Sequence, residues 1–173
     1  MDLGLKDKVA IITGATKGIG EACKNIFLEE GATVIALARD TSSLQQNEKL
    51  IPFNVDVSKT SEIEKFQTLI GTRFPQIDIL VNNVGTNVRK STEDYDQEDF
   101  DIMINTNLRS AWSMNRAIFP LMKKNGGSIV NLSSVASARS IKTSTLVYAM
   151  TKAGINQMTQ FLATEWGKYN IRV

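Results

Sequence analysis

The residues of this sequence best suited to chemistry are a tyrosine and a lysine four positions apart, Tyr148 and Lys152. On a helix, residues at this spacing share one face, so the phenol and the ammonium can point into one site. A cation about 4 Å from a phenol favours the phenolate by about 4 kcal/mol at an effective dielectric constant of about 20. Such a pair could exchange a proton with a bound substrate near neutral pH. The alternative is an ordinary exposed pair on a helix.

The absence of histidine narrows the acid–base groups that this chain can use. None of its 173 residues is His, which excludes Ser-His-Asp and Cys-His chemistry and most zinc sites, and we expect no metal site. Proton transfer must then involve Tyr, Lys, Asp or Glu. The single cysteine, Cys23, rules out a disulfide framework and suits a reducing compartment, so we expect a cytoplasmic protein.

A glycine-rich turn, Thr13–Gly20, is the second segment with chemical potential, since it follows an apolar run at 9–12 and opens a helical pattern. Gly14 permits a tight turn, Gly18 lets backbone N–H groups approach phosphates, and Gly20 lets helix and strand pack closely. The helix N-terminus adds partial positive charge. The segment therefore predicts a site for a dinucleotide pyrophosphate, the alternative being three glycines in an ordinary turn. The expected contact residues are Gly14, Thr16, Lys17, Gly18, Ile19 and Gly20.

Two more positions carry polar groups in informative places. Ser133 and Ser134 end an apolar run, at the sheet edge where open α/β folds bind ligands, and a hydroxyl there could donate to a carbonyl oxygen. A serine that satisfies loose backbone groups is an equally good interpretation. Asn107 lies inside a helical pattern, where Asn is a poor helix former. It indicates either a kink that holds a water molecule or an exposed position.

Alternating strands and helices must position these residues. The apolar runs are continuous, as in parallel strands that helices cover on both faces. Strands are expected at 8–13, 33–38, 50–55, 77–81 and 128–133, and helices at 18–29, 60–74, 97–123 and 147–168. The pattern predicts one α/β domain over residues 1–173, a doubly wound parallel Rossmann sheet in three α/β/α layers. The segment 40–49 allows one or two helical turns at most, and 171–173 reads as the opening of a sixth strand.

The composition is that of a globular chain, with 42% hydrophobic and 22% charged residues and a net charge of +2. This charge gives no electrostatic case for nucleic acid or a membrane surface, and we expect neither as a partner. No apolar run approaches the length that spans a bilayer, and residues 1–8 lack a signal-peptide pattern.

Taken together, the motifs make the chain similar to the short-chain dehydrogenase/reductase family over its whole length. The motifs occur in the family's order: Thr13–Gly20, Asn82–Gly85, Asn107 with Pro120, Ser133-Ser134, Tyr148 with Lys152, and Asn170–Val173. The resemblance implies a nicotinamide-dependent oxidoreductase. It implies that Tyr148 is the acid/base, that Lys152 favours the phenolate and holds the nicotinamide ribose, that Ser134 orients the carbonyl, and that Asn107 holds a proton-relay water.

The resemblance also assigns residues to the cofactor. Asn83 would steady the fourth strand, with Gly85 beside the cofactor, and Asp56 and Val57 would contact adenine. Val84 departs from the family's usual Ala and crowds the cofactor's approach.

The second half of the chain holds two further departures. Ser134 precedes Tyr148 by fourteen residues, one more than expected, so we expect the loop 138–146 to bulge. The family continues past Val173 with the rest of strand six, a Pro-Gly loop, a substrate lid and strand seven, so we expect the sheet to lack the family's C-terminal strands.

The choice between NAD and NADP depends on the end of the second strand. NAD requires a carboxylate there for the ribose 2′-hydroxyl, whereas NADP requires a cation for the 2′-phosphate. The acid position holds Ala38, and Arg39 follows it, with Lys17 in the glycine turn nearby. We therefore expect NADP(H). The alternative is two solvated surface cations, with Asp40 available to pair with Arg39.

The resulting hypothesis is an NADPH-dependent carbonyl reductase acting on a small-molecule ketone or alcohol. The segment Gly85–Lys90 and the pair Glu165-Trp166 look like the tropinone-reductase-like branch. Two rivals stay open: a 3-oxoacyl-acyl-carrier reductase, and a non-catalytic nucleotide-binding or dimerising fragment whose fifth strand is an exposed edge. Another Rossmann class, such as a methyltransferase, is disfavoured because Tyr148, Lys152 and Arg39 occur together.

The two long helices expected at 97–123 and 147–168 would pair across a two-fold axis by family resemblance. Their apolar positions are Phe100, Met103, Ile104, Ala111, Trp112, Ile155, Met158, Phe161 and Leu162. These are enough for both a sheet-facing side and a partner-facing side, so we expect a homodimer or a homotetramer.

Overall fold

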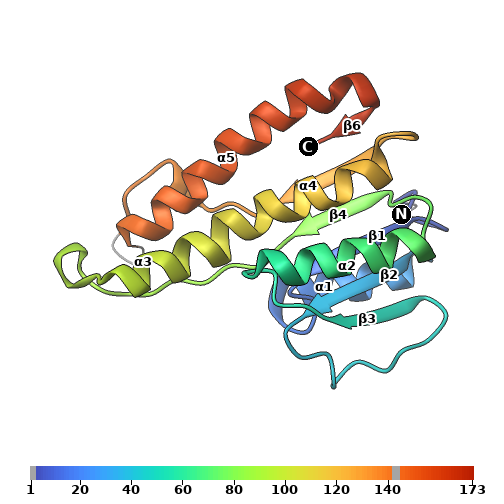
Figure 1. The fold of residues 1–173 in the computed structure, drawn as a ribbon, viewed down its shortest axis with the longest axis horizontal. Coiled ribbons are helices and arrows are strands. Elements are labelled where there is room, and N and C mark those ends of the chain that lie inside the picture. Colours follow the sequence, from blue (N-terminus) through green and yellow to red (C-terminus); the bar gives the residue numbers. More distant parts are fainter. Residues whose placement is uncertain (1–2, 142–144) are drawn as a thin grey trace.

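The computed structural model describes residues 3–141 and 145–173, and in this part of the chain six parallel strands form one sheet in the order β3-β2-β1-β4-β5-β6 (Figure 1). The strands are β1 (Val9–Thr13), β2 (Thr33–Ala38), β3 (Leu50–Asn54), β4 (Ile79–Asn82), β5 (Gly127–Asn131) and β6 (Ile171–Arg172). The α-helices are α1 (Gly18–Glu29), α2 (Thr60–Arg73), α3 (Gln97–Met103), α4 (Ser110–Met122) and α5 (Leu146–Trp166). The expected doubly wound parallel α/β fold is confirmed.

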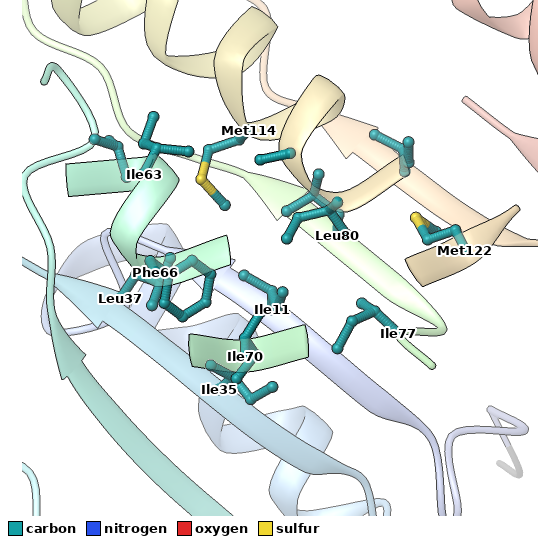
Figure 2. Close-up of a cluster of buried hydrophobic side chains, with 14 of the residues drawn as sticks. Ile11, Ile35, Leu37, Ile63, Phe66, Ile70, Ile77, Leu80, Met114 and Met122 are labelled. Carbon is teal, nitrogen blue, oxygen red and sulfur yellow. The ribbon is translucent and has the colours of Figure 1, made fainter. Parts of the chain in front are cut away.

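One face of the sheet carries the larger hydrophobic core, which Figure 2 shows in close-up. Ile63, Phe66 and Ile70 recur at the spacing of one helical stripe on α2, and all three are at most 3% exposed. Met114 and Met122 on α4 reach the same cluster. From the sheet, this core receives the side chains of Ile11, Ile35, Leu37 and Leu80.

The opposite face is covered more thinly. The side chains of Cys23 and Phe27 on α1 pack on a smaller cluster that includes Ile12 and Val34. Within the described residues, α1 is the one α-helix on that side, and Val130 of β5 is left 48% exposed. The helical layers expected on both faces are therefore unequal.

The long helix expected at 97–123 is interrupted. A π-helical segment, Ile104–Arg109, separates α3 from α4. The segment expected at 40–49 contains a turn and no helix, and Leu44 packs against the smaller core from it. The expected sixth strand is confirmed as β6, which pairs with Gly127 and Ser128. The expectation that the fifth strand forms the exposed edge is therefore wrong, because β6 adds one more strand beyond β5.

No helix in residues 3–141 or 145–173 is both long and apolar enough to cross a membrane.

Candidate active site

A cavity of about 400 Å³ lies where β4 and β5 end and α5 begins. It is lined by Ile19, Asn83, Gly85, Thr86, Asn87, Arg89, Leu132, Ser133, Ile141, Tyr148 and Lys152. The fold thus brings the glycine turn, the Asn82–Gly85 segment and the tyrosine–lysine pair to one place. This is the carboxyl edge of the parallel sheet, where open α/β folds bind ligands.

The glycine turn has the backbone geometry that its three glycines predict. Gly14 and Gly18 adopt φ values of +67° and +58°, which L side chains rarely tolerate. A Cβ atom on Gly18 would meet nothing within 4 Å, so the space beside this backbone is open. A Cβ atom on Gly20 would lie 2.3 Å from the carbonyl oxygen of Gly14. The turn can accept a pyrophosphate at the start of α1, with Thr16 half-buried and Lys17 exposed beside it.

Hydrogen bonds fasten this turn to the end of β4. Asn83 Nδ2 donates to the carbonyl oxygens of Thr13 (2.9 Å) and Gly14 (3.3 Å), and the backbone N–H of Asn83 donates to Thr13 Oγ1 at 2.9 Å. Thr13 Oγ1 in turn donates to the Val81 carbonyl. Sequence reasoning missed Thr13, although a hydroxyl at the last residue of a buried strand was a usable signal.

Lys152 is buried and held in one position. Its side chain is 3% exposed, and Nζ donates to the carbonyl oxygen of Leu132 at 2.7 Å. Burial lowers the pKa of Lys152, because the ammonium has lost most of its hydration. Nζ lies 5.8 Å from the centroid of the Tyr148 ring, and both residues line the cavity. The interpretation as an ordinary exposed pair is therefore wrong.

Gly85 lies beside both Lys152 and Asn107. A Cβ atom there would lie 3.4 Å from Lys152 Nζ and 3.5 Å from Asn107 Oδ1, which is ordinary contact. Asn107 is fully buried in the π-helical segment and does not line the cavity itself. Its Oδ1 accepts from the N–H of Thr86 at 2.7 Å, and its Nδ2 donates to the Thr86 carbonyl and to Thr151 Oγ1. The interruption of the helix at Asn107 matches the expected kink and excludes the exposed position.

The two serines at the end of β5 have different surroundings. Ser133 lines the cavity, and its hydroxyl donates to the carbonyl oxygen of Lys152 at 3.2 Å. Ser134, the residue expected to orient the carbonyl, does not line the cavity. Its Oγ accepts from the N–H of Ala136 and caps a 3₁₀ turn, Val135–Ser137. Part of the loop expected to bulge, 142–144, lies outside the described residues.

Comparison with known proteins identifies the family. A family model described as short chain dehydrogenase matches residues 8–173. The chain belongs to the short-chain dehydrogenase family. It is 36% identical to an NAD-dependent glycerol dehydrogenase of Listeria innocua, with 99% of this chain and 70% of that protein covered. It is 37% identical to a tropinone reductase homolog of Arabidopsis thaliana, with 97% of this chain and 67% of the relative covered.

Solved structures agree with this assignment. A short chain dehydrogenase from Leptospira borgpetersenii with bound NAD⁺ superimposes with a TM-score of 0.91 at 30% identity, covering 97% of this chain and 69% of that one. The family, the Rossmann fold and the likeness to tropinone reductases are thereby confirmed. The chain spans about 70% of the length of these relatives.

In this short-chain dehydrogenase, the residues expected at the adenosine end surround the ends of β2 and β3. Arg39 is exposed, and no carboxylate lies within 4 Å of it in residues 3–141 and 145–173. Asp40 forms no ion pair with Arg39 within 4 Å; its carboxylate accepts from the N–H of Ser42, and this hydrogen bond lowers the pKa of Asp40. Val57 is 5% exposed and packs into the larger core, so its side chain faces away from the surface.

Asp56 is held in its charged form. Burial would raise the pKa of Asp56, but hydrogen bonds from Ser58 and the charges of Lys59 and Arg39 outweigh burial and lower it. Its Oδ1 accepts from both the N–H and the hydroxyl of Ser58, and its Oδ2 lies 3.9 Å from Lys59 Nζ.

A cluster of buried asparagines under the site was not predicted. Asn82 Nδ2 donates to the Oδ1 atoms of both Asn115 and Asn131 at 2.8 Å, and Asn131 Nδ2 donates to Thr159 on α5. The cluster joins β4, β5, α4 and α5 directly behind the residues that line the cavity. Asn82 is identifiable from the sequence as part of the Asn82–Gly85 segment, whereas Asn115 carries no sequence signal.

Proposed function

We propose that this short-chain dehydrogenase reduces a ketone to a secondary alcohol with NADP(H), reversibly. One observation carries the proposal: Tyr148 and Lys152 line the same cavity as Asn83 and Gly85, next to the glycine turn. A proton donor and the expected cofactor site are therefore adjacent. The open space at Gly18 and its positive φ fit a bound pyrophosphate.

Each protein group then has a defined task. The carbonyl carbon would accept the hydride that a nicotinamide, when bound, would supply. Tyr148 donates the phenolic proton to the carbonyl oxygen, which completes the alcohol. Lys152, oriented by the Leu132 carbonyl, stabilises the phenolate left behind and can hydrogen-bond the nicotinamide ribose.

Two further residues position the reactants. We assign the hydrogen bond to the substrate carbonyl to Ser134, on family resemblance, although Ser133 is the cavity-lining residue. Separate Ser133→Ala and Ser134→Ala variants distinguish them, because only loss of the true donor lowers kcat strongly. We assign Asn107 to the proton path on family resemblance, and its bonds to Thr86 and Thr151 support the cavity wall.

NADP(H) is favoured by the charges at the adenosine end. Arg39 is exposed and has no ion-pair partner in the described part of the chain, while Lys17 is exposed in the glycine turn. An exposed guanidinium with no described carboxylate within 4 Å suits a 2′-phosphate, which it can bind bidentately. The glycerol dehydrogenase relative is NAD-dependent and a solved relative holds NAD⁺, so both cofactors belong in the first assay.

The decisive experiment follows NADPH oxidation with a panel of aliphatic and cyclic ketones, alongside cofactor binding by fluorescence. We expect turnover that Tyr148→Phe reduces by about 10²–10⁴-fold, the usual contribution of general acid–base catalysis, while cofactor binding is retained. Binding of NADPH without turnover of any ketone would refute the reductase and support a nucleotide-binding role alone.

We also propose a cytoplasmic homodimer or homotetramer assembled through α4 and α5. The exposed apolar side chains of Trp112 (45%) and Phe161 (61%) on these helices support it. Light scattering after size exclusion tests the assembly, and a monomer at micromolar concentration would refute it.

A further inference from the structure

Arg89 is a charged residue at the cavity that the proposed reaction leaves without a task. It lines the cavity together with Lys152, and no Asp or Glu of the described chain lines it. The ammonium of Lys152 is already hydrogen-bonded to the Leu132 carbonyl. The cavity is therefore positive, and Arg89 is its solvent-accessible cation.

The loop that carries Arg89 is anchored on the side nearer the site. Both backbone groups of Thr86 are hydrogen-bonded to Asn107. Asn87 Oδ1 accepts from Thr145 Oγ1, at the N-terminus of α5, at 2.9 Å. These contacts fix the start of the loop to the π-helical segment and to the N-terminus of α5, the helix that carries Tyr148, so the backbone that leads to Arg89 is held beside the cavity.

The next residue, Lys90, is a cation of the same loop that acidic side chains of the protein neutralise. Its ammonium forms ion pairs with Asp99 and Asp96, and these carboxylates raise the pKa of Lys90. Arg89 has no carboxylate within 4 Å in the described residues. Of two adjacent cations, one is neutralised by the protein and the other is left facing a ligand cavity.

We propose that Arg89 binds an anionic group on the substrate, so that the preferred substrates are oxo acids, ketones that carry a carboxylate. A guanidinium presents a planar pair of N–H donors that matches a carboxylate. The carboxylate on Arg89 would orient the ketone toward Tyr148. This inference rests on the proposed function, because it assigns the substrate class of the same cavity.

The test compares 4-oxopentanoate with its methyl ester, which carries the same ketone without the charge. For the unaltered protein we expect a lower KM for the acid. In Arg89→Met, the KM for the acid should rise about tenfold, the scale of one exposed charge-assisted contact, with kcat and the ester kinetics little changed. Lys124→Met removes the same charge from an exposed position outside the cavity and should leave both KM values unchanged.

A binding measurement separates this inference from the reductase proposal. Pentanoate, which has no ketone, should bind the NADP⁺-loaded protein in calorimetry and bind Arg89→Met about tenfold more weakly. Pentanoate binding that depends on Arg89, with no turnover of either ketone, would sustain the anion site and refute the reductase. Equal KM values for acid and ester with active enzyme would refute the anion site alone. A rise in the KM for NADPH rather than for the acid would assign Arg89 to the cofactor phosphates and overturn the inference.

Discussion

Replacing Gly20 with alanine tests whether close packing holds the glycine turn in its binding geometry. The new Cβ atom would lie 2.3 Å from the Gly14 carbonyl oxygen and 2.5 Å from Asn83 Nδ2. An ordinary contact begins near 3.4 Å, so the backbone must move by about 1 Å. Overpacking of this kind costs about 1–3 kcal/mol, and weakening the hydrogen bonds of Asn83 adds about 1 kcal/mol. Higher helix propensity returns up to about 1 kcal/mol.

The net loss for Gly20→Ala is therefore about 1–3 kcal/mol, which lowers Tm by about 3–9 °C for a domain of this size. Differential scanning calorimetry measures it directly. Gly167→Ala is the control, because a Cβ atom there meets nothing within 4 Å and its φ is −53°, so its Tm should stay level or rise. A Gly20→Ala protein as stable as the unaltered chain would refute the packing argument.

Gly18→Ala separates binding from packing in the same turn. Its Cβ atom would meet open space, so the main cost is the left-handed backbone, about 1 kcal/mol. The added methyl group would occupy the space beside the backbone where a pyrophosphate would approach. We therefore expect Gly18→Ala to weaken NADPH binding strongly and to lower Tm by less than Gly20→Ala does. A Gly18→Ala protein that loses more Tm than Gly20→Ala and binds NADPH normally would contradict the roles assigned to the two glycines.

Three other variants follow from the buried and charged groups. Asn115→Ala should lower the free energy of unfolding in urea by about 2 kcal/mol, because it removes one of the two acceptors of the buried Asn82 Nδ2, and an unchanged midpoint would contradict this. Lys152 has a lowered pKa in the folded chain, so the unfolded chain binds more protons as pH approaches 10.5, and stability relative to Lys152→Met should rise over that range. A flat difference in urea midpoints against pH would show that burial of Lys152 costs nothing. Arg39→Asp should shift the ratio of kcat/KM values from NADPH toward NADH by at least about tenfold, and an unaltered ratio would remove Arg39 from cofactor selection.

The strands and the glycine turn were predictable because their signals are local. Strands β1, β2 and β4 are short, largely apolar runs, and parallel strands buried on both faces require that pattern. The glycine turn likewise places its three special residues within seven positions, at Gly14, Gly18 and Gly20. Backbone conformations at positive φ leave a direct trace in the sequence, since other residues rarely adopt them.

The sequence indicated the interruption at Asn107 as one of two interpretations and could not decide between them. Asparagine inside a helical pattern indicates a competing hydrogen bond, but its partners Thr86 and Thr151 lie far away in the chain. Which of the two interpretations holds depends on those tertiary contacts. The same reason hides Asn115, whose only distinguishing feature is that the fold places it against Asn82.

The distinction between Ser133 and Ser134 could not be read locally either. Adjacent residues at the end of a strand point in opposite directions, so a shift of one position exchanges the side chain that faces the cavity for the one that caps the next turn. The capping bond from Ala136 to Ser134 is a property of the turn after β5, which the sequence predicts poorly.

Helix α5 carries both Tyr148 and Lys152, the pair that we propose for proton transfer, so its attachment to the sheet controls the candidate site as a whole. Ser133 binds the Lys152 carbonyl, Lys152 Nζ binds Leu132, and Asn131 binds Thr159 two turns further along. These contacts tie three successive residues at the end of β5, Asn131, Leu132 and Ser133, to α5. A displacement of α5 would therefore move the phenol and the ammonium together and preserve their spacing while changing their distance from the glycine turn. The geometry of the pair is thus fixed by the helix, and its alignment with a bound cofactor is fixed by the end of β5.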